Sequence, residues 1–406
     1  GPPPFTREEA HDLIFNGQFQ NFMQEQSYGR VSFSGDVYGW ITINSFISNF
    51  GNACGAAGLE TPEISNLIQQ QGINLSFYDR IVFMVQNLDS GCAEVGKTSH
   101  DFFGASYYLS IAHVGVPGPE IPLFILSHEV GHNLGVYHAN GWDCDNQTLH
   151  GDCFHIEYGN PFDTMGTGNF HFNSFFKQRL GWLSDSSVLQ ISRNGRYTLA
   201  PLELSSGKRL AVIRRVAPDD RLYKPLVLEH RRAIGFDSDL SNPEISSNEG
   251  GLFISKIKFD DLIRLLDASA TGAPWDIDKM QITLNAGQVF VDEDYGVRLE
   301  TISVDESGII FDVAFAPMTC VRHPPSFNKD GIVSRPNPYQ NVIFSPAISG
   351  SVPALATSRV YNADSPMCYH SRFNISALNI PEGWSFSTNE EEIILSPDEE
   401  EYGYLS

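Results

Sequence analysis

HEVGHNLGVYH, which runs from His128 to His138, places three histidines and a glutamate in one short stretch. His128 and His132 are four residues apart, so on a helix both imidazoles lie on one face and can bind one metal ion. Glu129 lies roughly 100° further round the helix, where a carboxylate can take a proton from a water held by the metal. Gly135 can adopt the left-handed conformation that ends a helix, which allows His138 to turn back as a third ligand.

Three protein ligands with one position open to water are typical of catalytic zinc, whereas structural zinc sites are usually closed by four ligands rich in cysteine. The stretch therefore predicts one catalytic Zn²⁺, bound by His128, His132 and His138. The opposite face of the same helix carries apolar residues at helical spacing, which predicts that it packs on a core. These residues are Leu123, Leu126, Val130 and Leu134.

The stretch matches the long zinc signature of the metzincin metallopeptidases. Downstream, DTMG at 163–166 resembles the Met-turn of that family, whose methionine, here Met165, forms an apolar floor beneath the metal. Four further runs resemble the gametolysin-like branch of secreted metzincins. They are SYGRVSFSGDVYGW, YDRIVFMV, YGNPFDTMG and FHFNSFFKQRLGWL.

The resemblance implies a secreted zinc-dependent endopeptidase that hydrolyses peptide bonds of extracellular proteins or glycoproteins, with an extended polypeptide as its substrate. Glu129 would activate the zinc-bound water. The start, GPPPFTREEA, has no apolar segment of a signal peptide, which fits a form whose propeptide has been removed. Two alternatives use the same residues: a non-catalytic adhesin or binding protein with a residual zinc site, and a zinc amidohydrolase of a non-protein substrate.

One position departs from the pattern of the astacin-like and serralysin-like relatives, which carry a tyrosine two residues after the methionine. Here that position is Thr167. Stabilisation of the oxyanion is then left to zinc and to a side chain that the motif does not identify, with Tyr158 as a candidate. The polar segment before Met165 also offers His150 and His155 as further ligands, and its aspartates as a Ca²⁺ site.

The composition excludes some partners. The chain has 406 residues, 49 acidic against 26 basic side chains and a net charge of −23, which argues against nucleic-acid binding. No apolar run approaches the roughly 18 residues of a membrane helix, so we expect no membrane span. We also expect a monomer.

The cysteines predict disulfides formed in an oxidising, extracellular compartment, because no CxxC pair is present. Six cysteines allow about 15 connectivities, and the simplest joins neighbours. These pairs are Cys54 with Cys92, Cys144 with Cys153, and Cys320 with Cys368. Three sequons predict a glycoprotein, at Asn74, Asn146 and Asn374.

The length of the chain predicts three domains, as does the change along it from a mixed helix and strand pattern to short β-like runs. Residues 1–183 would form an α+β metzincin-type catalytic domain, with a twisted mixed sheet and the active-site helix. Short β-like runs then predict a β-rich, sandwich-like accessory domain over 184–316. After a proline-rich boundary, 317–406 would form an immunoglobulin-like β-sandwich that can be incomplete at its C-terminal end.

Local patterns place several elements. Thr6 and Glu9 form a capping box at the start of a helix, and 31–33 with 37–43 predict a hairpin. The apolar run 80–85 predicts a buried strand. By resemblance, a strand over 105–114 would form the upper rim of the cleft, to which substrate adds as a further strand. Later, helices are predicted from Asn173 or Ser174 to Leu180 and over 260–266.

Overall fold

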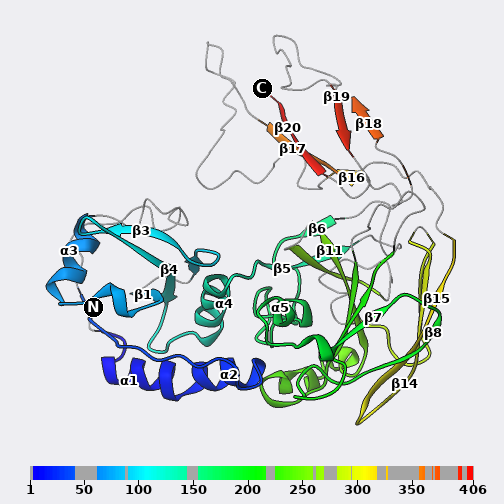
Figure 1. Cartoon of the computed structure of the whole chain (residues 1–406), viewed down its shortest axis with the longest axis horizontal. Helices are drawn as coiled ribbons and strands as arrows, with labels where there is room; N and C mark the ends of the chain where they lie inside the picture. The colour runs from blue at the N-terminus through cyan, green and yellow to red at the C-terminus, as the bar shows by residue number, and fades with distance from the viewer. Residues whose placement is uncertain are drawn as a thin grey trace.

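The computed structural model mixes helices with sheets, and strands predominate (Figure 1). The structure describes residues 3–41, 62–86, 90–143, 154–215, 225–258, 262–268, 281–293, 295–317, 326–327, 356–361, 368, 371–374, 392–395 and 400–405.

Three short helical segments open the chain: α1 (Arg7–His11), η1 (Asp12–Asn16) and α2 (Gln18–Gln26). The predicted capping box is confirmed, because the Thr6 hydroxyl accepts a bond from Glu9 N at 3.1 Å and the Glu9 carboxylate accepts one from Thr6 N at 2.7 Å. Buried apolar residues of α2 share a core with Leu126 and Val130. The opening helices therefore support the segment that carries the zinc signature.

The hairpin predicted over 31–33 and 37–43 is wrong for residues 31–41, which form no strand in the structure. Instead, Gln20 Nε2 donates to Phe33 O at 3.1 Å, and Phe33 N donates to Gln20 Oε1 at 2.9 Å. A helix side chain thus satisfies the backbone groups that a partner strand would have paired. Residues 42 and 43 lie outside the described residues.

The first sheet has its longest strand in the middle. Its strands are β1 (Arg80–Gln86), β2 (Gly91–Ala93), β3 (Thr98–Phe102) and β4 (Ala105–Val116), and α3 (Pro62–Gln70) and η4 (Leu75–Phe77) precede them. β4 runs parallel to β1 on one edge and antiparallel to β2 and β3 on the other. The predicted strands over 80–85 and 105–114 are confirmed. The rim role predicted for 105–114 does not fit residues 112–114, because these pair with β1 on one edge and with β2 on the other.

The first part of the stretch, from His128 to Leu134, lies on α4 (Leu123–Leu134), which packs on β4 and β2. Pro122 precedes its first turn, and Gly135 ends it with φ 109°, a left-handed conformation that favours glycine. The Gly135 N–H donates to His132 O at 2.8 Å. The predicted helix end is therefore confirmed, and the chain turns back toward α4 immediately before His138.

The second sheet has seven strands in the order β6-β5-β12-β11-β10-β9-β7. Their bounds are β5 (Ala139–Asp143), β6 (Phe154–Ile156), β7 (Val188–Ile191), β9 (Leu210–Ile213), β10 (Leu226–His230), β11 (Leu252–Lys258) and β12 (Leu262–Leu266). β5 begins directly after His138 and runs parallel to β12, with Ala139 opposite Ile263. The boundary predicted after residue 183 therefore falls between strands that belong to one sheet.

A third sheet packs on the second. It has the order β13-β14-β15-β8. Its strands are β8 (Gly195–Leu199), β13 (Val289–Asp292), β14 (Val297–Asp305) and β15 (Gly308–Phe315). The two sheets share one apolar core, to which Ile213 and Leu228 contribute from one side and Phe290 and Phe311 from the other. Two sheets packed face to face in this way form a sandwich.

The helix predicted over 260–266 is wrong over residues 262–266, which form the strand β12; residues 260 and 261 lie outside the described residues. The sequence LIRLL is apolar at spacings that fit a helix and a buried strand equally well. The strand is favoured because it is paired on both edges, and Arg264 lies buried with its guanidinium carbon 4.4 Å from the centre of the Trp142 ring.

Beyond residue 317 the structure describes two small sheets, formed by β16 (Ser326–Phe327), β17 (Ala356–Tyr361), β18 (Ser371–Asn374), β19 (Glu392–Leu395) and β20 (Glu400–Leu405). The immunoglobulin-like sandwich stays a prediction. Cys92 and Cys368 are disulfide-bonded. Their pairing stays a prediction, and the other four cysteines and Asn146 lie outside the described residues. Asn74 is exposed. None of the described helices has both the length and the apolar character needed to cross a bilayer.

Candidate metal centre

Three histidines converge where α4 ends and β5 begins. His128 and His132 lie one turn apart on α4, and the turn at Gly135 brings His138 back beside them. One ring nitrogen from each of the three lies within 4.8 Å of the others. In the part of the chain that the structure describes, no other group of three His, Cys, Asp or Glu side chains is spaced to hold a metal ion.

A hydrogen bond fixes the ring orientation of each histidine. His128 Nδ1 lies 2.7 Å from Thr164 O, and His132 Nδ1 lies 2.9 Å from Val136 O. His138 Nδ1 bonds the carboxylate of Glu157. Because a carbonyl or carboxylate oxygen can only accept, each Nδ1 carries the proton and each Nε2 presents its lone pair. This is the arrangement that metal-ligating histidines require.

The protonation state of the two buried histidines also suits a metal. Burial lowers the pKa of His128 to about 3 and that of His132 to about 4. Their imidazoles are therefore neutral at physiological pH, and a neutral imidazole is the form that binds a metal ion.

Glu129 is buried beside the histidines, with 5% of its surface exposed. Burial raises the pKa of this carboxyl to about 8, and a bound cation would oppose that shift. Its Oε2 has no hydrogen-bond partner among the described residues. A buried oxygen without a partner is costly unless a ligand or water satisfies it, so the position fits a general base better than a structural residue.

The edge of the first sheet approaches Glu129 closely. A Cβ added at Gly91, the first residue of β2, would overlap the Glu129 carboxylate. Glycine is therefore needed for the backbone of β2 to lie against the base. Gly91 could not be singled out from the sequence, because nothing in the run GCA distinguishes it from an ordinary turn glycine.

Met165 lies below α4 and is fully buried. A Cβ at Gly131 would overlap its sulfur, so the glycine inside the signature allows the methionine to approach the helix. The Asp163 carboxylate shapes the turn by accepting bonds from Met165 N and from Asn173 N, both at 2.7 Å. Asn173 also caps the predicted last helix, α5 (Ser174–Arg179), which is confirmed.

Arg231, which follows β10, reaches the Met-turn from the second sheet. Its Nη1 donates to Phe162 O at 2.6 Å and to His171 O at 3.2 Å, on either side of the turn. Its Nε donates to Glu229 at 2.7 Å, and Asp237 lies 3.6 Å from Nη1. All these groups are buried. A charged network that the motif does not contain therefore holds the floor of the site.

Tyr158 lies against the third histidine. Its ring centre is 3.8 Å from that of His138 and 5.7 Å from that of His128. Its backbone is left-handed, with φ 59°, which is unfavourable for a bulky side chain. The Asn140 side chain holds this conformation by accepting a bond from Tyr158 N at 2.9 Å. The strained position presents the ring to the histidines.

Glu157 is a second residue of the site that the sequence motif does not contain. The Glu157 carboxylate bonds His138 and also His155 Nε2, the latter at 2.9 Å. His155 therefore helps to hold Glu157 and is not among the three converging histidines. The two histidines hold the pKa of Glu157 well below its usual range. Several acidic residues precede Met165, and no sequence signal singles out this one. His150 lies outside the described residues.

The residues present fit zinc. Three imidazoles with anchored Nδ1 atoms, beside a carboxylate oxygen without a partner, form a donor set of the kind that holds catalytic zinc. Comparison of the sequence with known protein families and with curated proteins finds no match.

Proposed function

We propose that the chain is a secreted zinc-dependent endopeptidase of the metzincin type, most like the gametolysin-like branch. The observation that carries the proposal is the convergence of His128, His132 and His138 beside the unpartnered oxygen of Glu129. The disulfide-bonded Cys92 and Cys368 support an extracellular location.

Zinc bound at the three histidines would polarise a substrate carbonyl and lower the pKa of water. The chain itself supplies the proton transfers. Glu129 takes a proton from the attacking water and delivers it to the leaving amine nitrogen, as a general base and then a general acid. Burial keeps bulk water away from this carboxyl group, and Gly91 leaves room for it.

The substrate would lie along β2 and not along β4. Beside the site, residues 112–114 of β4 are paired on both edges, whereas β2 is the outer strand at the end of the sheet nearest Glu129. An extended polypeptide that pairs with β2 as a further strand would gain backbone hydrogen bonds with little dependence on sequence. Its scissile bond would then pass between β2 and the histidines.

Tyr158 would donate a hydrogen bond to the oxygen that becomes negative in the transition state. Its hydroxyl has no hydrogen bond to a described residue. Burial, and then the charges of Glu157 and Glu129, raise the pKa of Tyr158, so the hydroxyl keeps its proton. The Tyr158 ring is held against His138. Thr167 stands at the position where the astacin-like and serralysin-like relatives carry a tyrosine, so that position supplies no phenolic donor.

Removal of the metal should abolish hydrolysis. Treatment with 1,10-phenanthroline is expected to stop cleavage of fluorescent casein, and stoichiometric Zn²⁺ to restore it, because the imidazoles alone cannot polarise a carbonyl. The isomer 1,7-phenanthroline, which does not chelate, is the control. Zinc is counted by atomic absorption in the same samples.

The same measurement separates the alternatives. Cleavage that persists in zinc-free protein would contradict the proposal. Fully zinc-loaded protein that cleaves no denatured protein would instead favour a binding protein or an amidohydrolase of a non-protein substrate. Mass-spectrometric mapping of cleavage sites in a peptide library would define the bond that is cut.

Substitution of Tyr158 with Phe should lower kcat by about 100-fold, the effect of losing one donor to an oxyanion, and leave KM almost unchanged. Phenylalanine keeps the ring contact with His138, so zinc content should not change. Tyr137→Phe, an exposed tyrosine two residues from the helix end, is the matched control. An unchanged kcat in Tyr158→Phe would remove Tyr158 from the mechanism.

A further inference from the structure

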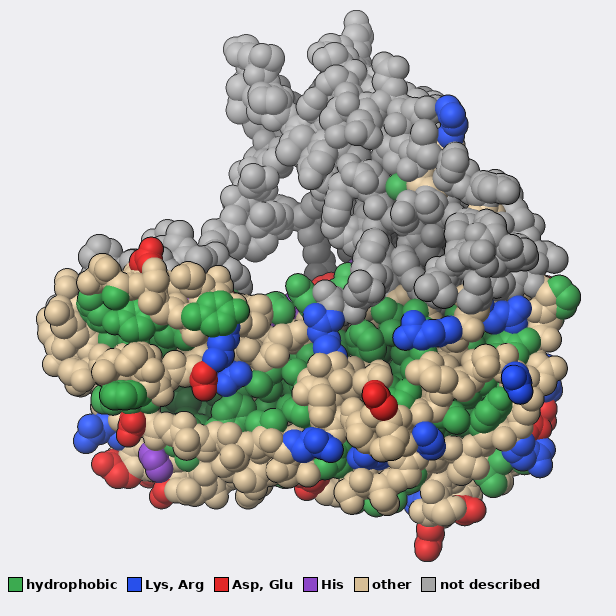
Figure 2. All heavy atoms as spheres, viewed as in Figure 1, with side chains coloured by type: hydrophobic (Ala, Val, Ile, Leu, Met, Phe, Trp, Pro, Cys, Tyr) green, Lys and Arg blue, Asp and Glu red, His purple; other side chains and the backbone are tan. Residues whose placement is uncertain are grey.

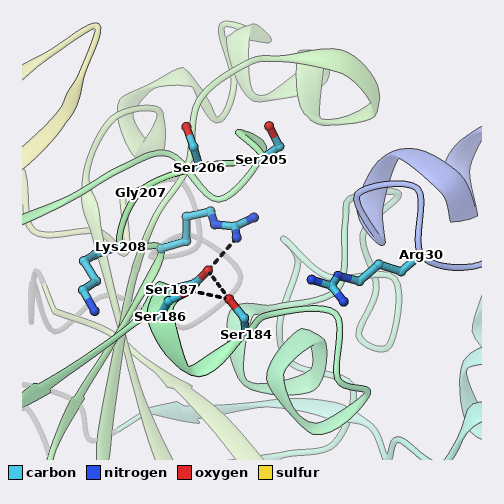
Figure 3. Close-up of a pocket in the computed structure, with 9 residues that line it drawn as sticks. Arg30, Ser184, Ser186, Ser187, Ser205, Ser206, Gly207 and Lys208 are labelled. Carbon is cyan, nitrogen blue, oxygen red and sulfur yellow. Dashed lines mark hydrogen bonds between the residues drawn. The ribbon is translucent and has the colours of Figure 1, made fainter.

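A second site lies outside the metal centre, in a pocket of about 310 Å³. It lies between the segment after α2 and two turns that flank β7, β8 and β9 (Figure 3). Its lining consists of three basic residues, Arg30, Lys208 and Arg209, with one glycine and five serines. No carboxylate lines it, although the chain carries a net charge of −23. Asp185 belongs to one of the turns but is not part of the lining.

Arg209 is the buried cation of this pocket, with 4% of its surface exposed. Its Nη1 donates to Leu204 O at 2.9 Å and its Nη2 to Ser187 Oγ at 2.7 Å, while its Nε has no partner. Its guanidinium carbon lies 4.2 Å from the centre of the Tyr28 ring. No carboxylate of the described residues pairs with it. A buried charge without a counter-ion is unfavourable, and an anion in the pocket would remove that cost.

The other two cations are also free of carboxylates. Lys208 Nζ donates to Val188 O at 2.8 Å, a neutral acceptor. Arg30 is exposed and forms no ion pair with a described residue. Figure 3 shows its guanidinium pointing across the pocket toward Ser184. Basic groups therefore approach the pocket from two separate parts of the chain.

The serines add hydroxyl donors to this positive charge. Ser184 Oγ lies 2.7 Å from Ser186 Oγ and 3.2 Å from Ser187 Oγ, so the hydroxyls form one connected group next to Arg209. Hydroxyl hydrogens can rotate toward an acceptor that enters the pocket. On the face of the molecule drawn in Figure 2, further Lys and Arg side chains lie over the half that carries α5 and the second sheet.

We propose that this pocket binds a tetrahedral oxyanion, as the phosphate or sulfate group of a monoester. Guanidinium groups recognise such groups through paired N–H donors, and serine hydroxyls complete the coordination. The volume of 310 Å³ equals that of roughly ten water molecules, which is more than a free ion needs. An ester that carries a neutral sugar ring would fill it better.

Isothermal titration calorimetry at constant ionic strength tests the site, with sodium phosphate, sodium sulfate, glucose 6-phosphate and glucose 6-sulfate as probes. Arg30→Gln and Lys208→Gln, both exposed, should each weaken binding about tenfold by removing one charged donor. Arg196→Gln removes the same charge from an exposed arginine paired with Asp312, and should bind like the wild type. Casein cleavage should be unchanged in all three variants.

Each outcome decides the proposal. Tighter binding of the esters supports an ester site, and equal binding of the free ions supports an ion site with the same chemistry. The proposal is overturned if none of the probes binds at about 10 mM, a concentration tenfold above a Kd of about 1 mM. It is also overturned if Arg196→Gln weakens binding as much as the two pocket variants. Neither result depends on whether the metal centre is catalytic.

Discussion

Substitution of Glu129 with Gln is expected to lower kcat for casein hydrolysis by about 10³-fold, because general acid–base catalysis contributes roughly two to four decades in rate. Glutamine has the same shape but cannot accept the proton of the attacking water. Zinc should remain bound, since the proposed ligands are His128, His132 and His138, and Glu129 bonds none of their Nδ1 atoms. Steady-state kinetics measure kcat, and zinc analysis of the same preparation measures the bound metal.

The exposed Glu120, in the loop before α4, provides the matched control for this substitution. Glu120→Gln makes the same chemical change outside the site, and its kcat should equal that of the wild type. If Glu129→Gln keeps both its zinc and its cleavage of casein, the assignment of Glu129 as the base is wrong. If zinc is lost together with activity, Glu129 supports the metal and its role in proton transfer has to be tested at saturating zinc.

Substitution of Arg231 with Met is expected to lower the free energy of unfolding by about 3–5 kcal/mol, because it leaves buried acidic partners without their counter-charge. Those partners are Glu229 and Asp237, which are 5% and 0% exposed. The variant should also bind zinc more weakly, since Arg231 holds the carbonyls of Phe162 and His171 on either side of the Met-turn. Urea unfolding followed by fluorescence, with a parallel zinc titration, measures both effects.

Arg196→Met is the control for the Arg231 substitution. Arg196 pairs with Asp312 on the surface, with 61% of its side chain exposed, so its loss should leave the urea midpoint unchanged. An Arg231→Met protein that unfolds at the wild-type urea concentration would show that the buried network does not stabilise the fold. Unchanged zinc affinity in a destabilised protein would show that the network acts on the second sheet alone.

Local sequence was enough to predict the helical part of the site. His128 and His132 have helical spacing, Gly135 has the dihedral freedom that a helix end requires, and Thr6 with Glu9 forms a capping box from adjacent residues. Each of these features depends on contacts within about one helical turn. The structure bears out all three.

Contacts between distant residues could not be predicted. The position of β4 inside its sheet depends on pairing with β1 and β2, and the strand at 262–266 depends on its alignment with β5. The side chains that complete the site also reach it through contacts between residues far apart in the sequence. Glu157 and Arg231 are ordinary charged residues in the sequence, and only the folded chain brings them to His138 and to the Met-turn.

The parallel alignment of β5 with β12 also has a consequence for how the protein matures. His138 directly precedes β5, but the strand that fixes β5 on one edge comes about 120 residues later in the chain. Such non-local pairing raises the contact order and delays the formation of a segment during folding. During synthesis, the third histidine would stay unfixed until the ribosome has released β12. A nascent chain would thus be unable to bring its three histidines together until most of its second sheet has assembled.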